Sequence, residues 1–197
     1  MTRRLESQRL EPQRLEMNQW VPYPVEMVFA FFANPSNLPH LMPSWQRARI
    51  ESSRIQPPPE RPLRSDPALR FQSTAAGAGS EMMISFRPVV GIPLRLKWLA
   101  VITEFVWFEY FEDVQAYGPF AHWKHRHTMR SETQDGQPGT RVTDAVEYAL
   151  PLGVLGRWMD AWMVGRQMRE TFAYRQRRLM QILPVVQEQS RRRHSSA

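Results

Sequence analysis

The segment GPFAHWKHRHTMR, residues 118–130, begins with a turn signal and continues as a strict alternation of side-chain types. Successive side chains of an extended strand point to opposite faces. Lysine, arginine and threonine take every second position from residue 124 and mark the solvent face. The other face is predicted to point inward, and it holds Trp123, His125, His127 and Met129.

Strand-like runs lie on both sides of this segment. Glycine and proline signals separate them, and their aromatic and β-branched residues favour extended structure. Since consecutive runs are joined by short turns, we expect an antiparallel meander. The predicted strands are residues 17–21, 46–55, 81–87, 94–103, 108–116, 120–132 and 140–150.

Helical periodicity replaces the alternation at both ends of the strand region. Residues 25–33 carry an apolar stripe, and a second short helix is predicted at residues 37–41. After Pro151 the apolar spacing changes to three or four, which predicts a long helix from about residue 154 to 183. We therefore predict an α+β fold in which a curved antiparallel sheet wraps around one long C-terminal helix, with two short helices after the first strand.

Chain length and composition fit one domain. The 197 residues are 42% apolar, which is enough for one substantial core, whereas two complete domains would be cramped. We assign residues 17–183 to this domain, between a flexible N-terminal tail at residues 1–16 and a basic C-terminal tail at residues 184–197. A proline- and arginine-rich loop at residues 57–69 interrupts the domain.

Residue content disfavours several classes of site. The lack of cysteine excludes disulfides, thiolate metal sites and a cysteine nucleophile. We find neither a secretory leader nor an apolar run of about 18 residues, and expect a soluble, cytoplasmic protein. There is no Gly-x-Ser-x-Gly elbow, and GAGS at residues 77–80 lacks the context of a phosphate loop. No cofactor is predicted.

The formal net charge of +7 raises the question of nucleic-acid or membrane binding. The arginines are spread over the loop at residues 61–64, the predicted helix at residues 166–178 and the tail at residues 191–193. Such a dispersed pattern favours a solvated surface, so we expect no nucleic-acid partner.

Three segments of the chain carry a resemblance to a known superfamily. They are PVEMVFAFFANPSNLPHLMP at residues 24–43, GPFAHWKHRH at residues 118–127 and GTRVTDAVEYALPLGVLG at residues 139–156. The chain resembles the SRPBCC superfamily of START-like proteins, and within it the stand-alone bacterial ligand-binding proteins of the polyketide cyclase/dehydrase group. The resemblance implies a helix-grip fold with a deep apolar cavity under the long helix, used for lipids, polyketides, hydrophobic hormones or quinone-like molecules. It implies no catalytic set, because the superfamily contains binders, carriers and enzymes.

Neighbouring strands are predicted to add carboxylates to the histidine face. If residues 117–120 form a hairpin turn, Asp113 lies across from His125 and His127, and Asp144 shares their face from the following strand. Three interpretations stay open: the carboxylates satisfy buried histidines, the cluster is the polar end of a ligand pocket, or a histidine acts as a general acid/base. Two histidines on one strand without a third ligand do not predict a metal site.

The leading hypothesis is a non-catalytic binder or carrier of a small hydrophobic or amphipathic molecule, acting as a monomer or homodimer. One alternative is a cyclase or dehydratase that uses His125 or His127 as general acid/base. Another is an interaction module that uses the basic surface and the proline-rich loop. The residues predicted to bind the ligand are Trp98, Phe108, Tyr110, Asp113, Trp123, His125, His127, Asp144, Tyr148, Trp158, Trp162 and Phe172.

Overall fold

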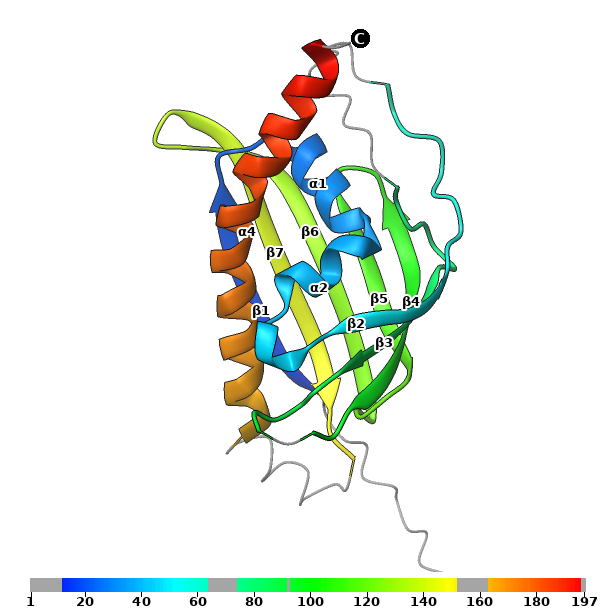
Figure 1. Ribbon diagram of the computed structural model, residues 1–197. Coiled ribbons are helices and arrows are strands. Elements are labelled where there is room, and N and C mark those ends of the chain that lie inside the picture. The colour runs from blue at the N-terminus through cyan, green and yellow to red at the C-terminus, as the bar shows by residue number, and fades with distance from the viewer. Residues whose placement is uncertain (1–11, 64–73, 92, 152–162, 196–197) are drawn as a thin grey trace, which may run out of the picture.

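The computed structural model describes residues 12–63, 74–91, 93–151 and 163–195 (Figure 1). Within these residues, one seven-stranded antiparallel sheet has the strand order β1-β7-β6-β5-β4-β3-β2. The strands are β1 (Gln13–Val21), β2 (Arg49–Arg54), β3 (Glu81–Phe86), β4 (Leu96–Val106), β5 (Tyr110–Tyr117), β6 (His122–Gln134) and β7 (Gln137–Ala149). The helices are α1 (Val25–Ala33), α2 (Leu38–Leu41) and α4 (Gly165–Ser195), with short 3-10 helices at Pro35–Asn37 and Ser44–Gln46.

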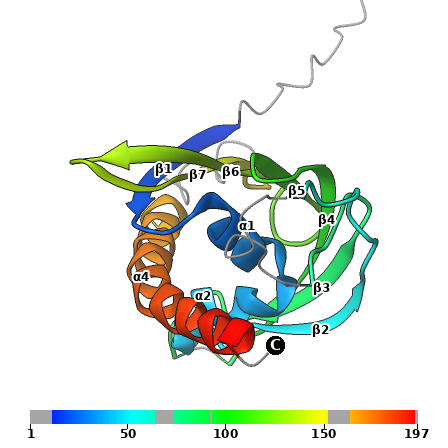
Figure 2. The ribbon, with the colours of Figure 1, turned by 90° about the horizontal axis from the view of Figure 1, so that it is seen from above.

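The strands β1 and β2 lie at opposite edges of the sheet, although they are neighbours in the sequence. The chain between them, which contains α1 and α2, therefore has to cross the concave face. Figure 2 shows the sheet curling around α1, with α4 lying beside β1. Since α2 also contacts α4, helices from both halves of the chain cover the concave side.

The side chain of Phe29 anchors α1 inside the curve of the sheet. It is fully buried, and its ring meets Phe105, Phe108 and Phe111 edge-on, with ring centroids 5.3, 5.8 and 6.0 Å away. Edge-to-face aromatic pairs add about 0.5–1.5 kcal/mol each beyond the burial of area. Nearly every residue of α1 is buried, which explains why its sequence is apolar on almost all sides.

Helix α4 covers the outer edge of β1. The Gln19 side-chain amide donates to the Gln176 carbonyl at 3.0 Å, and the Gln176 amide donates to the Asn18 carbonyl at 3.2 Å. On the inner face of the helix, Phe172, Leu179 and Leu183 are buried at a spacing that keeps them on one side. The helix is thus held by an apolar stripe and by hydrogen bonds to the strand edge.

The predicted element order and strand register are confirmed. Two short helices follow the first strand, and the long helix follows the meander, as expected of the helix-grip fold. Asp113 lies opposite His125 in the β5–β6 pair, and His127 lies opposite Asp144 in the β6–β7 pair. The side chains that the alternation in residues 118–130 predicts to point inward are therefore the buried ones.

Both predicted tails are too long. Strand β1 begins at Gln13, because residues 13–16 continue the ladder with β7 as far as Tyr148. Helix α4 continues to Ser195 and includes Pro184, where the prediction ended the helix. From Gln187 onward the residues are polar and mostly favour helix, and Arg192 pairs with Glu188 one turn away at 2.8 Å. The predicted start of the helix at residue 154 and residues 1–11 of the N-terminal tail lie outside the described residues.

Part of the predicted loop at residues 57–69 lies against the turn between β4 and β5. The indole N–H of Trp107 donates to the Pro59 carbonyl at 2.7 Å, and the Arg61 guanidinium lies 4.4 Å from the Trp107 ring centroid. In that turn Phe108 has a φ of 64°, so the strand predicted to start there begins at Tyr110 instead. Residues 57–63 are thereby fixed to the body of the domain, and residues 64–69 lie outside the described part.

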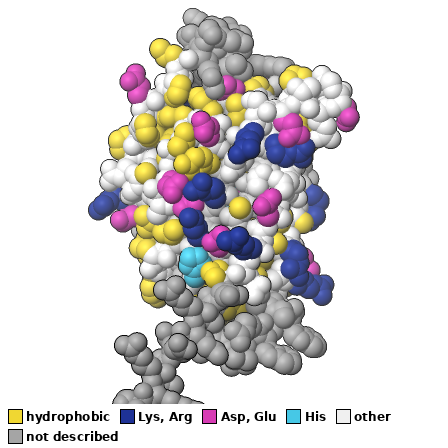
Figure 3. Space-filling model, turned by 180° about the vertical axis from the view of Figure 1, so that it is seen from behind, with side chains coloured by type: hydrophobic (Ala, Val, Ile, Leu, Met, Phe, Trp, Pro, Cys, Tyr) yellow, Lys and Arg dark blue, Asp and Glu magenta, His cyan; other side chains and the backbone are white. Residues whose placement is uncertain are grey.

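The convex face of the sheet carries charged side chains of both signs among hydrophobic and uncharged ones (Figure 3). Glu112 is 3% exposed there, and its carboxylate accepts from Arg126 Nε at 2.9 Å and pairs with Lys124 Nζ at 3.1 Å. Arg126 also binds Glu104 at 2.7 Å and lies over the Tyr110 ring. Cross-strand pairing of opposite charges explains how this face remains polar while the concave face is apolar.

Candidate ligand-binding site

A cavity of about 320 Å³ lies between the concave face of the sheet and the helices. Its sheet side includes Met82, Ile84, Trp98, Ala100 and Ile102 of β3 and β4. Its helix side comes from α1, α2 and α4, among them Phe31, Leu38, Met168 and Phe172. Most of the wall is therefore apolar, and the volume falls within the usual range of small-molecule sites.

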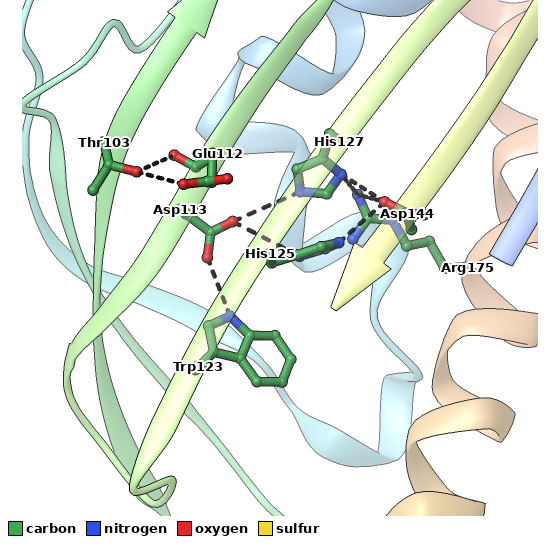
Figure 4. Close-up of polar contacts among 8 residues, drawn as sticks. All are labelled: Thr103, Glu112, Asp113, Trp123, His125, His127, Asp144 and Arg175. Atoms are coloured by element: carbon green, nitrogen blue, oxygen red, sulfur yellow. Dashed lines mark hydrogen bonds and ion pairs between the residues drawn. The ribbon is translucent and has the colours of Figure 1, made fainter. Parts of the chain in front are cut away.

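A polar cluster interrupts the apolar wall where β5 and β6 pair. Asp113, His125 and His127 all line the cavity, because their positions share the concave face. Trp123 Nε1 donates to Asp113 Oδ2 at 3.3 Å. Asp113 Oδ1 lies 3.7 Å from both His125 Nδ1 and His127 Nε2, which is too far for a hydrogen bond (Figure 4).

Asp144 of β7 holds both imidazoles from the other side. Its Oδ1 lies 3.2 Å from His125 Nε2 and 2.6 Å from His127 Nδ1 (Figure 4). A carboxylate oxygen only accepts hydrogen bonds, so these two ring nitrogens are assigned the protons. The lone pairs of His125 Nδ1 and His127 Nε2 then face Asp113.

Arg175 of α4 brings a positive charge to this buried cluster. Its guanidinium NH2 lies 3.8 Å from Asp144 Oδ1. It also lies 3.3 Å from His127 Nδ1, but it cannot donate to this nitrogen, which is assigned a proton. The same guanidinium lies 5.0 Å from the centroid of the Phe32 ring. The helix is thus linked to the polar cluster on the concave face as well as to the apolar residues of that face.

The environment shifts the pKa values of three groups in the cluster. Burial, together with the nearby His127, lowers the pKa of His125 from 6.5 to about 4. For Asp144, burial acts to raise the pKa, but Arg175 and the two histidines outweigh it and hold the pKa well below 3.8. Burial also acts against ionisation of Asp113, yet its contacts with the histidines and Trp123 lower its pKa overall. At neutral pH both carboxylates are charged and His125 is neutral.

Aromatic rings fix the two imidazoles in place. His127 stacks on Phe111 with centroids 4.4 Å apart, and His125 meets the Phe172 ring edge-on at 5.4 Å. The two imidazole centroids are 3.8 Å apart. Because each ring is held by packing and by Asp144, the nitrogens that face the cavity have defined directions.

Three buried polar atoms around the cavity have no hydrogen-bond partner among the described residues: Gln46 Oε1, Trp98 Nε1 and Arg175 Nε. All three residues line the cavity. Buried polar atoms are rarely left unpaired in folded proteins. A polar group of a bound molecule, or water, can satisfy them.

The structure brings together half of the residues predicted to bind ligand. Trp98, Asp113, Trp123, His125, His127 and Phe172 line the cavity. Asp144 lies behind the histidines, and Tyr148 packs with Trp123 and Phe172. Phe108 belongs instead to the core around Phe29, and Tyr110 lies on the convex face beneath Arg126, so the placement of these two in the cavity wall was wrong. Trp158 and Trp162 lie outside the described residues.

The sequence reasoning missed Arg175 and the contributions of α1 and α2. Arg175 was assigned to a solvated helix face, yet it comes three residues after Phe172 and four before Leu179, on the buried stripe. Its position in that stripe was the available signal. Phe32 and Leu38 reach the cavity because the β1–β2 connection crosses the concave face, which only the strand order reveals.

Solved structures place this arrangement among START-like helix-grip proteins. A Thermus thermophilus protein, TTHA0849, is 17% identical with a TM-score of 0.58 over 88% of this chain and 98% of its own. A START superfamily protein from Mycobacterium smegmatis is 12% identical, with a TM-score of 0.54 over 88% of this chain and 98% of its own. Ginseng major latex-like protein 151 from Panax ginseng is 9% identical, with a TM-score of 0.54 over 86% and 95%. At these identities the likeness shows the fold.

The family follows from the sequence itself. The family described as polyketide cyclase / dehydrase and lipid transport matches residues 21–177, and the chain belongs to it. Curated proteins give no significant match. Among the described residues, no helix combines the length and apolar character needed to cross a membrane.

Proposed function

We propose that this protein binds and carries a small hydrophobic or amphipathic molecule, such as a lipid, polyketide or quinone-like compound, in the cavity between the sheet and α4. The observation that supports this most is the combination of an apolar wall with one polar cluster at Asp113, His125 and His127. Apolar cavities with a few fixed polar groups are typical of small-molecule sites. The family and the fold point in the same direction.

The polar end of the ligand is expected to lie against the cluster. Its apolar body would contact Met82, Ile84, Ile102 and Phe172, which lie elsewhere on the wall. The unpartnered Trp98 indole N–H offers a hydrogen bond to a carbonyl or hydroxyl oxygen of the ligand. This orientation makes recognition depend on one oxygen-bearing end of an otherwise apolar molecule.

A pair of variants tests the occupancy of the cavity. Ala100 lines the cavity, and its neighbour Val101 points to the opposite face of β4. Ala100→Phe should fill the cavity, whereas Val101→Phe adds a similar bulk outside it. Native mass spectrometry should find a co-purifying apolar molecule on the wild type and on Val101→Phe, but not on Ala100→Phe. The proposal fails if the wild type carries none and a panel of lipids and polyketides gives no thermal shift.

Acid/base catalysis as a cyclase or dehydratase receives less support from the same cluster. With a pKa of about 4, His125 is unprotonated at neutral pH and has no proton to donate as a general acid. The two carboxylates are also ionised, because their pKa values are lowered. Turnover that disappears in His127→Gln while ligand binding persists would nevertheless establish the catalytic alternative.

A further inference from the structure

Three acceptor atoms converge at one point of the cavity wall. They are Asp113 Oδ1, His125 Nδ1 and His127 Nε2, and the oxygen is 3.7 Å from each nitrogen. Asp144 takes the N–H groups on the far side of both rings, at 3.2 and 2.6 Å. No donor from the described residues lies between the three inward atoms at hydrogen-bond distance, since Trp123 donates to the other oxygen of Asp113. Facing lone pairs repel unless a hydrogen-bond donor or a cation lies between them.

We propose that Asp113, His125 and His127 form a site for one divalent transition-metal ion of the zinc or iron(II) class. Two imidazole nitrogens and one carboxylate oxygen are a donor set that such ions accept. One ligating atom from each of the three residues lies within 4.8 Å of the others. This site goes beyond carriage of an apolar molecule and does not depend on it.

The distance from the carboxylate oxygen to each imidazole nitrogen is close to what an ion requires. Ligands at about 2.0–2.2 Å from a tetrahedral ion are roughly 3.4 Å apart. The observed separation of 3.7 Å between the carboxylate oxygen and each nitrogen needs adjustments of only a few tenths of an ångström.

Asp144 has the position of the carboxylate that commonly supports metal-bound histidines. Such a carboxylate accepts the N–H of the nitrogen that does not bind the ion, and so fixes the tautomer and direction of the ring. Here a single oxygen does this for both imidazoles. Phe111 and Phe172 restrict the same rings by packing. The site is therefore preorganised before any ion arrives.

The charge of the cluster also favours a cation. Asp113 and Asp144 contribute two negative charges, and Arg175 contributes one positive charge close to Asp144. Apart from the imidazoles, these charges sum to one negative charge in a buried setting, where charge imbalance is costly. A divalent ion beside Asp113 would neutralise it. All three ligands line the cavity, so the remaining coordination positions face a bound molecule and could take one of its oxygen atoms.

Metal titration tests the site. Protein stripped with EDTA and dialysed should bind about one equivalent of Zn²⁺ by calorimetry. Bound Co²⁺ should give the visible absorption bands of a cobalt ion in a coordination geometry of low symmetry. Asp113→Asn and His125→Gln should each lower the affinity about 100-fold or more, whereas Asp144→Asn should lower it about 10–100-fold. His122 lies on the same strand but is exposed, so His122→Gln should bind as the wild type does.

A measurement on the wild type removes any dependence on folded variants. Nitrogen-15 NMR of the imidazoles should show His125 Nδ1 and His127 Nε2 shifting on addition of Zn²⁺, with their other ring nitrogens staying protonated. The site is refuted if the wild type binds neither Zn²⁺, Co²⁺ nor Fe²⁺, or if binding is unchanged in folded Asp113→Asn. Shifts confined to His40, His122 or His194 would refute it equally. No apolar ligand enters these experiments, so their failure leaves the carriage proposal standing.

Discussion

Replacing His125 by glutamine should remove a large part of the acid sensitivity of the fold. His125 is 4% exposed, and burial lowers its pKa from 6.5 to about 4. Between these two values the unfolded chain binds a proton at this position and the folded chain does not. The free energy of unfolding therefore falls as the pH drops from 6.5 to 4, and it rises again with pH across the same window.

The size of this effect follows from the shift. Each pKa unit corresponds to about 1.4 kcal/mol, so the full window amounts to about 3 kcal/mol for this one side chain. Glutamine cannot be protonated, and the corresponding loss is absent from His125→Gln. The lowered pKa values of Asp113 and Asp144 also favour acid unfolding, but their stabilisation is retained above about pH 3.8 and is lost below it. The two effects are separated on the pH axis.

Urea unfolding, monitored by tryptophan fluorescence, measures how the free energy of unfolding of each protein depends on pH. The titration runs from pH 7.5 to 4.5 at constant ionic strength with EDTA present, so that no bound ion contributes. The wild type and His122→Gln, which alters an exposed histidine on the same strand, should lose stability together. The curve of His125→Gln should be flatter by most of the calculated amount. Parallel curves for all three proteins would show that the pKa of His125 is the same in the folded and unfolded chain, which would refute the effect of its burial.

Three further predictions concern the ion pairing, core packing and helix stability of the fold. Arg175→Met removes the guanidinium that helps to keep Asp144 ionised, and chemical denaturation should show a loss of about 2 kcal/mol or more, which the exposed Arg177→Met should not share. Phe29→Ala empties the aromatic cluster beneath α1 and should cost about 3–5 kcal/mol by urea unfolding; a loss below about 1 kcal/mol would contradict the packing described. Pro184→Ala replaces an exposed proline inside α4 and should stabilise the helix by up to about 3 kcal/mol, visible as a higher thermal midpoint, whereas a lower midpoint would mean that the proline is needed there.

The fold could be predicted because its determinants are local. Alternation from Trp123 to Met129 sets which side of β6 is buried, and short turns on either side carry the same parity into β5 and β7. The same parity is sufficient to predict that Asp113, His125, His127 and Asp144 share one face of the sheet. Most of the polar cluster is therefore a direct consequence of strand geometry.

The errors concern residues that strand alternation excludes from the cavity face or whose position no regular period predicts. Tyr110 cannot share a face with Phe111 and Asp113, because adjacent residues of a strand point to opposite sides. Phe108 lies in a turn with a positive φ, which no periodicity of a strand predicts. Arg175 occupies a partly buried helix position because the Asp144 carboxylate on β7 lies close to its guanidinium. Such a pairing becomes visible only in three dimensions.

The helix lying along β1 also bears on how copies of this chain can meet. An unpaired strand edge invites another strand to add to the sheet. At β1 this addition would have to displace α4, together with the hydrogen bonds that join Gln19 and Asn18 to Gln176. The opposite edge, β2, carries Arg49, Glu51 and Arg54 on a largely exposed strand, and such charges discourage edge-to-edge pairing. A helix thus covers one edge of the sheet, and charged side chains oppose pairing at the other. Self-association, where it occurs, is therefore expected to use surfaces other than a continuous intermolecular sheet.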